Sequence, residues 1–265
     1  MSESIISKSE FSFPDPMPKK FVAFIDVLGF SELVFKNQNI ELESYFKTVS
    51  DILAEMKADG DAIESISISD SIILIAPISL QGLKKLIKGV RNIQKKLLFK
   101  NILMRGAISL GEVFFDDSRN IIVGKGYIRA YLLEQEAVFP RVIIDPAILK
   151  EMETDRVGFL RLTNGEQEQR QSNIIYEHSN DSQIPNDAIF VNYAYTITSE
   201  KTISKVIGKV YYNLKKNLYS EQKLYSKYTW LKNYYLEFVK YSEATTPNKL
   251  HKSVLKEWIT KFERL

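Results

Sequence analysis

Cysteine is absent from this 265-residue chain, and histidine occurs only twice, as His178 and His251. Without cysteine, the chain has no disulfide, no thiolate zinc site and no cysteine nucleophile. Two histidines are too few for a histidine-rich metal site, and they disfavour most histidine-based acid–base mechanisms. Any bound metal is therefore expected to be a hard ion with oxygen ligands, which points to magnesium or manganese.

Long apolar stretches are also missing. The first 16 residues, MSESIISKSEFSFPDP, lack the apolar segment of a signal peptide. No part of the chain approaches the roughly 20 consecutive apolar residues that span a bilayer. We therefore expect a cytoplasmic protein without a membrane partner. The length, with 45% hydrophobic and 26% charged residues, is typical of one large globular domain, with or without an appendage.

The net charge is small, at +3, but the positive charge is concentrated at one end. Residues 197–265 contain 14 Lys and Arg against 6 Glu, or +8, which leaves −5 for residues 1–196. A basic surface of this kind can bind nucleic acid or another polyanion. Lysines spread along solvated helix faces give the same count, and we favour this interpretation over a nucleic-acid partner.

The periodicity of apolar residues predicts an α+β chain. Strands are predicted at 20–27, in two segments of 62–77 joined by a turn at 69–71, as a pair within 102–115, at 140–145 and at 188–195; helices are predicted at 31–56, 80–99 and 124–137. This order is that of the ferredoxin-like palm fold, an antiparallel sheet backed by helices on one face and open on the other. We expect an N-terminal arm (1–17), an α+β domain (18–196) that is loop-like at 151–186, and a basic helical C-terminal appendage (197–265).

A carboxylate ends the first predicted strand, in FVAFIDVLGF (21–30). A buried ionised carboxylate needs a partner, so Asp26 is expected to bind a metal ion, a basic side chain or backbone donors. Asp70 lies at the predicted hairpin turn, and the palm topology brings both carboxylates to one edge of the sheet. Either residue alone is also explained as a helix cap or an ordinary turn residue. Because two adjacent carboxylates repel each other unless a cation lies between them, the pair predicts a site for divalent metal ions.

Three stretches, FVAFIDVLGFSELV, SISDSIIL and RGAISLGEVFF, resemble motifs of the class III nucleotidyl cyclases in the same order. The resemblance spans about residues 18–145. The matching residues are Phe24, Asp26, Gly29 and Phe30 in the first motif, Asp70 in the second, and Arg105, Ile108 and Gly111 in the third. Ala107 and Ser109 replace a glycine and a histidine of the third motif.

The resemblance implies a nucleotidyl cyclase that uses two metal ions. Asp26, Asp70 and the Val27 carbonyl are expected to bind two Mn²⁺ or Mg²⁺ ions, and Arg105 is expected to hold the triphosphate as a bidentate clamp. The ribose 3′ oxygen would attack the α-phosphorus in line and expel pyrophosphate. Gly29 permits a tight turn after the first strand, so that the next helix presents backbone N–H groups to phosphate oxygens.

The residues that select adenine in the adenylyl cyclases of this family are missing. Ile66 and Ile121 occupy the positions of the adenine-selecting lysine and aspartate. The chain is therefore not expected to be an adenylyl cyclase. Alignment at Gly124 also places Ile128 and Leu132 where that group has its transition-state asparagine and arginine. Two alternatives stay open: the helix only packs, or the role is taken over by Tyr127, Arg129 or Tyr131.

GKGYIRAYLLEQEAVFPRVIID (124–145), together with FIDVLGF and SDSIIL, resembles the bacterial Pycsar cyclases. The resemblance implies a homodimer with sites at the subunit interface, a preference for manganese, and UTP or CTP as substrate, with UTP favoured. The product would be cyclic UMP or cyclic CMP, a second messenger of anti-phage defence bound by a separate effector protein. The nucleotide-binding residues implied are Phe24, Gly29, Phe30, Arg105 and Arg129. A place in the apolar core explains Phe24 equally well.

Two other functions remain open on the sequence. A different palm-type nucleotidyl transferase would use the same pair of aspartates on another acceptor. A cyclase-like module would bind a nucleotide without turning it over, and the missing asparagine and arginine favour this alternative.

Overall fold

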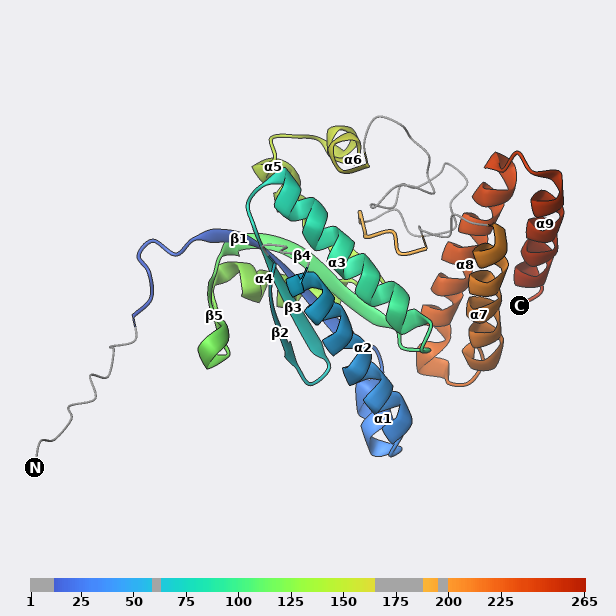
Figure 1. Cartoon of the computed structure of the whole chain (residues 1–265), viewed down its shortest axis with the longest axis horizontal. Coiled ribbons are helices and arrows are strands. Elements are labelled where there is room, and N and C mark those ends of the chain that lie inside the picture. Colours follow the sequence, from blue (N-terminus) through green and yellow to red (C-terminus); the bar gives the residue numbers. More distant parts are fainter. Residues whose placement is uncertain (1–11, 59–62, 165–187, 195–199) are drawn as a thin grey trace, which may run out of the picture.

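The computed structural model describes residues 12–58, 63–164, 188–194 and 200–265 (Figure 1). Its main sheet has five strands in the order β2–β3–β1–β4–β7. Their bounds are Lys19–Val27 (β1), Glu64–Ile68 (β2), Ser71–Pro77 (β3), Met104–Glu112 (β4) and Val142–Ile144 (β7). β1 is antiparallel to both β3 and β4, whereas β7 is parallel to β4. The α+β fold is the one the sequence predicts, with β7 as an added parallel edge strand.

The central strand β1 is apolar on both faces, because successive side chains of a strand point to opposite sides. Phe21, Ala23 and Ile25 belong to the core beneath α2 (Asn39–Ala58) and α3 (Leu80–Leu98). Val22 and Phe24 belong to a second cluster that includes Ala130 of α4 (Lys125–Glu136). The second face of the sheet is therefore not open as predicted, since α4 packs on it.

α4 approaches β4 very closely at a pair of glycines. A Cβ atom placed on Gly111 would lie 2.7 Å from the backbone nitrogen of Gly126, so Gly111 has no room for a side chain, and a Cβ on Gly126 would be crowded at 3.1 Å from the Gly111 nitrogen. The buried Ser109 hydroxyl donates a hydrogen bond to the Gly126 carbonyl at 2.7 Å. The GKG sequence at 124–126 thus holds α4 against the sheet.

Several predicted elements are wrong in detail. Residues 31–56 form two helices, α1 (Phe30–Phe35) and α2, and the chain between them has a positive φ of 51° at Asn37. The strand pair predicted within 102–115 is instead the long strand β4 and the short β5 (Phe114–Asp116), which pairs with β6 (Ile121–Val123). The short 3₁₀ helix η1 (Asp117–Arg119) joins β5 to β6.

Two more corrections concern the segment after β7. The predicted loop 151–186 contains helix α6 (Arg156–Asn164), which follows α5 (Pro146–Glu151). The rest of this predicted loop, residues 165–186, lies outside the described residues, as do residues 1–11 of the predicted arm. Within 188–194, the predicted strand is reduced to a single bridge between Phe190 and Ile143.

The C-terminal appendage consists of α7 (Glu200–Asn217), α8 (Gln222–Thr245) and α9 (Lys249–Glu263), which lie side by side at one end of the sheet (Figure 1). Its buried side chains form one cluster with Leu103, Ala107 and Ile143 of the sheet region. The appendage is thus packed against the domain that carries the sheet. Across the described ranges, the helices lack the combination of length and hydropathy that a membrane span requires.

Candidate active site

Asp26 lies at the end of β1, directly opposite Ser71 of β3 and Arg105 of β4. Its side chain is on the same face of the sheet as Phe24, because the two residues are separated by one position. The five residues of β1 before it, Phe21–Ile25, are buried, whereas Asp26 is half-buried. Asp26 therefore lies where β1 leaves the apolar core, at the edge of the sheet formed by the strand ends.

Asp70 reaches the same edge through the β2–β3 hairpin. Ile68 and Ser71 are paired, so Ser69 and Asp70 form a two-residue turn, with a positive φ of 56° at Ser69. The hydroxyl of the buried Tyr45 donates a hydrogen bond to the Ser69 carbonyl at 3.3 Å. This contact ties the turn to α2 and fixes the position from which Asp70 points.

The two carboxyl groups are close enough for a side-chain hydrogen bond between Asp26 and Asp70. The pKa of Asp26 is raised from 3.8 to about 7, first by burial and then by the negative charges of Asp70 and Glu134. The positive charge of Arg105 lowers the pKa of Asp26, but this effect is smaller than each of these three that raise it. The protein's own groups therefore leave a concentration of negative charge at this edge that a cation would neutralise.

The donors present fit a divalent metal ion of the hard class. In the described part of the chain, no group of three or more His, Cys, Asp or Glu side chains is arranged as a metal site. Magnesium-type ions are commonly held by one or two carboxylates, with phosphate oxygens and water as the other ligands. The pair Asp26 and Asp70 matches that kind of site, and the Val27 carbonyl lies next to it in the chain.

Arg105 is also half-buried at this edge, and it is paired with a residue that the sequence did not single out. Its Nε contacts Oε1 of Glu134, near the C-terminal end of α4. The Glu134 side chain is 4% exposed, and burial raises its pKa, with Arg105 opposing the shift. A guanidinium has five N–H donors, so a contact through Nε orients Arg105 without using its terminal nitrogens.

The other three residues of the first motif, Phe24, Gly29 and Phe30, have roles in the turn or in packing. Gly29 has a φ of +81° and precedes α1, a helix of six residues. The Phe30 ring packs on Tyr45, with centroids 5.8 Å apart. The Phe24 ring is 5% exposed and lies against Tyr127 and Tyr131 of α4, at 6.1 and 5.4 Å. Phe24 is thus a core aromatic in this structure.

Arg129 is held away from this edge within the single chain. Its Nη2 donates to Oδ1 of the fully buried Asp145 at 2.8 Å, and its Nε contacts Oδ2. The backbone nitrogen of Asp145 donates to the Ile108 carbonyl, which places Asp145 about level with Ser109. That level is four residues from Arg105 along β4, or roughly 13 Å at about 3.3 Å per residue.

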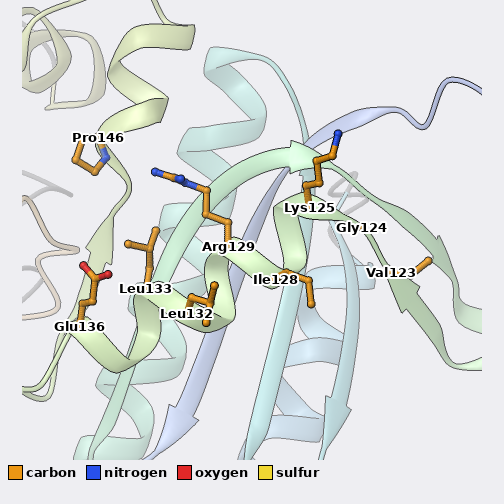
Figure 2. Close-up of a pocket in the computed structure, with 9 residues that line it drawn as sticks. All are labelled: Val123, Gly124, Lys125, Ile128, Arg129, Leu132, Leu133, Glu136 and Pro146. Carbon is orange, nitrogen blue, oxygen red and sulfur yellow. The ribbon is translucent and has the colours of Figure 1, made fainter.

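A groove of about 880 Å³ runs along the exposed side of α4, next to Arg129 (Figure 2). Ile128 and Leu132 line it and are 51% and 55% exposed. The figure shows Arg129 extended along this groove toward Pro146. Asp26, Asp70 and Arg105 do not line it. The groove is therefore a surface separate from the aspartate pair.

No protein-family model and no curated protein matches the chain. Similar solved structures include the adenylyl cyclase CyaB from P. aeruginosa, at 20% identity over 51% of this chain and 80% of that one (TM-score 0.37). A guanylyl cyclase domain from the aquatic fungus Blastocladiella emersonii is 14% identical over 51% and 84% (TM-score 0.40). An adenylate cyclase from Trypanosoma brucei is 9% identical over 69% and 92% (TM-score 0.44). At these values, function has to be inferred from the site itself.

Proposed function

We propose that this chain is a class III nucleotidyl cyclase that converts a pyrimidine nucleoside triphosphate into its 3′,5′-cyclic monophosphate and pyrophosphate. The observation that carries the proposal is the meeting of Asp26, Asp70 and Arg105 at one edge of the sheet. These residues come from three separate stretches, and each stretch matches a cyclase motif. Two carboxylates beside a guanidinium suit a substrate that brings both metal ions and phosphates.

Each residue has a defined task in this proposal. Asp26 and Asp70, with the Val27 carbonyl, hold two Mn²⁺ or Mg²⁺ ions, which when bound lower the pKa of the ribose 3′ hydroxyl and offset the charge of the leaving pyrophosphate. Arg105 grips phosphate oxygens with its terminal nitrogens while Glu134 holds its Nε. The pairing keeps the guanidinium in place before substrate arrives, which reduces the ordering cost on binding.

The surroundings of Ile66 support a pyrimidine. Ile66 is 6% exposed and packs with Phe24 and Ile73 in the cluster beneath α4. Ile66 offers a base no hydrogen-bond partner, so a purine bound beside it would leave ring nitrogens and exocyclic groups unpaired, at about 1–3 kcal/mol for each buried group. A pyrimidine is smaller and has fewer groups to satisfy. UTP is favoured over CTP on the resemblance to the Pycsar cyclases alone.

A homodimer with sites at the subunit interface is part of the proposal. Supporting it, Ile128, Tyr131 and Leu132 leave an apolar row exposed on α4, at 51%, 42% and 55%. Arg129 lies on the same helix and is 51% exposed in its side chain, although its guanidinium contacts Asp145. In a dimer built on α4, Arg129 would face the partner. A cytoplasmic enzyme of this kind would supply a second messenger to a separate effector in anti-phage defence.

One observation favours a second candidate, a nucleotide-binding module without turnover. The positions of the transition-state asparagine and arginine hold Ile128 and Leu132, and the neighbouring Arg129 contacts the buried Asp145. Such a module would keep the aspartate pair and Arg105 for binding and would form no product.

Steady-state kinetics of the full chain with Mn²⁺ and each of the four nucleotides separate these functions. We expect kcat/KM to be highest for UTP, second for CTP, and lower by at least about tenfold for ATP and GTP, a difference that needs only about 1.4 kcal/mol. An ATP value equal to that of UTP would contradict the pyrimidine assignment. Tight nucleotide binding with no turnover would favour the module.

A further inference from the structure

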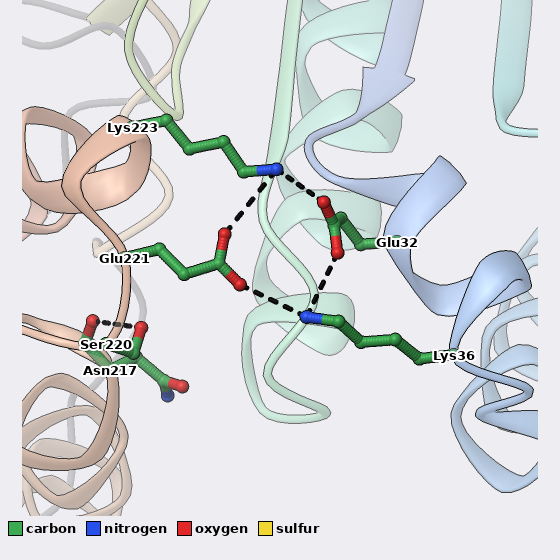
Figure 3. A network of polar contacts seen from close by, with 6 residues as sticks. All are labelled: Glu32, Lys36, Asn217, Ser220, Glu221 and Lys223. Atoms are coloured by element: carbon green, nitrogen blue, oxygen red, sulfur yellow. Dashed lines mark hydrogen bonds and ion pairs between the residues drawn. The ribbon is translucent and has the colours of Figure 1, made fainter.

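The C-terminal appendage is tied to the segment that follows Asp26 by a ring of four charges (Figure 3). Lys223 of α8 contacts Glu32 of α1, and Lys36, the residue after α1, contacts Glu32 at 3.0 Å and Glu221 at 3.2 Å. Lys223 lies 3.5 Å from Glu221 and closes the ring. The start of α8 is thereby fixed beside α1, which begins four residues after Asp26.

Apolar contacts place the same appendage beside two residues of the site, Asp26 and Arg105. Leu103, two positions before Arg105, belongs to the cluster that contains the buried side chains of the appendage, and Leu28, two positions after Asp26, packs against that cluster. The Leu28 backbone nitrogen donates to the Leu103 carbonyl at 2.9 Å, which joins the ends of β1 and β4 beneath the appendage. The appendage therefore covers the strand ends that carry Asp26 and Arg105.

Lys227 lies one helical turn after Lys223, so the two side chains share one face of α8. Lys227 is half-buried, and this face of α8 is the one that Lys223 turns toward Glu32 of α1. Burial lowers the pKa of Lys227, with the positive charges of Arg105 and Lys223 adding to the shift. Within the described residues, its ammonium has neither a hydrogen bond nor an ion pair to offset this cost.

We propose that Lys227 is a second phosphate-binding residue of the site, supplied by the C-terminal appendage, and that it grips the substrate's polyphosphate together with Arg105. This inference rests on the proposed function for the identity of the ligand. Two cations brought together without a shared carboxylate form a site for an anion with several charges, and a triphosphate is such an anion. Arg105 already contacts Glu134, which offsets part of its charge, so a second cation would add to what Arg105 and the metal ions offer the triphosphate.

The proposal gives the appendage a role in substrate binding. The ring of charges fixes the start of α8 beside α1, and Lys227, one helical turn further along α8, then faces the phosphates. A lysine suits this position because its ammonium is a compact charge on a flexible stem.

Binding of inorganic triphosphate in the presence of Mn²⁺, measured by calorimetry on the full chain, tests the inference. Lys227→Met is expected to weaken binding by at least about tenfold, the value of one charge-assisted contact, and Lys227→Arg to restore most of it. Lys232→Met is the matched control, since Lys232 is half-buried on the same helix but about 140° around it from Lys227. The melting temperature of ligand-free Lys227→Met should equal or exceed that of the wild type.

Weaker triphosphate binding by Lys227→Met, with the control unchanged, supports the inference whether or not the wild type forms a cyclic product. Equal binding by Lys227→Met and the wild type overturns it, even if the wild type is an active cyclase. A lower melting temperature with unchanged binding also overturns it, because Lys227 would then act only in packing.

Discussion

Asp26 and Arg105 face each other directly across β1 and β4, yet the Nε of Arg105 contacts Glu134, and the negative charge of Asp70 helps to raise the pKa of Asp26. The arginine is thus oriented by the helix above the sheet. The aspartate is left beside a second carboxylate. This separation of the two charges is what a site needs if the arginine is to bind phosphate and the aspartates are to bind metal.

Replacing either aspartate should abolish turnover without harming the fold. We expect Asp26→Asn and Asp70→Asn each to lower kcat with Mn²⁺ by roughly two orders of magnitude or more, because each removes a charged metal ligand. The metal-free melting temperature should stay level or rise, since each change relieves a repulsion. The exposed Asp51→Asn on α2 is the control. Near-normal turnover by Asp26→Asn or Asp70→Asn would contradict the assignment of these residues as ligands of two metal ions.

The raised pKa of Asp26 predicts how metal affinity depends on pH. Between pH 3.8 and about 7, the folded metal-free chain keeps a proton on Asp26 that the unfolded chain releases. Its free energy of unfolding therefore falls as pH rises through this range. Mn²⁺ requires the ionised carboxylate, so its apparent affinity should rise up to about tenfold per pH unit below pH 7 and level off above.

Titrations of Mn²⁺ followed by the melting temperature, at several pH values around 7, check this prediction. The apparent Mn²⁺ affinity of Asp26→Asn should not change with pH in this way. A wild-type affinity that stays constant across the range would mean that Asp26 is ionised without metal, against the electrostatics of the site.

Glu134→Gln tests whether Glu134 positions Arg105. The change removes the charge that faces the Nε of Arg105, so we expect KM for UTP to rise more than kcat falls. Removing this nearby negative charge should also lower the pKa of Asp26, which shifts the pH midpoint of Mn²⁺ binding downward. The free energy of unfolding should fall by about 1–3 kcal/mol. Glu136→Gln, exposed on the same helix, is the control; identical kinetics of the two variants would exclude the positioning role.

The exposed row on α4 predicts a dimer contact. Leu132→Glu places a charge in an apolar row, and we expect light scattering to show a dimer for the wild type and a monomer for the variant. Turnover should be lost with the dimer if each site needs the partner. Val157→Glu on α6 changes a residue that is equally exposed, at 55%, and should affect neither. A monomeric wild type that still turns over UTP would contradict the shared site.

Much of the fold could be predicted from local patterns, because the continuous apolar run of β1 and the turn around Asp70 depend on neighbours in sequence. The break at Asn37 was missed because neither glycine nor proline marks it. Glu134 carries no signal of its own, since a charged residue in a helix is normally solvated. Lys227 lies 122 positions after Arg105, and only the packing of α8 on the strand ends brings their charges together.

The identity of the product tests the central claim most directly. The full wild-type chain and Asp26→Asn are incubated with an equal mixture of the four nucleoside triphosphates and Mn²⁺, and the products are identified by mass. We predict that the wild type forms a cyclic pyrimidine monophosphate, mainly cyclic UMP, with one pyrophosphate for each product, and that Asp26→Asn forms none. A wild-type reaction without any cyclic nucleotide, or an equal yield from Asp26→Asn, would contradict the assignment of this chain as a metal-dependent cyclase.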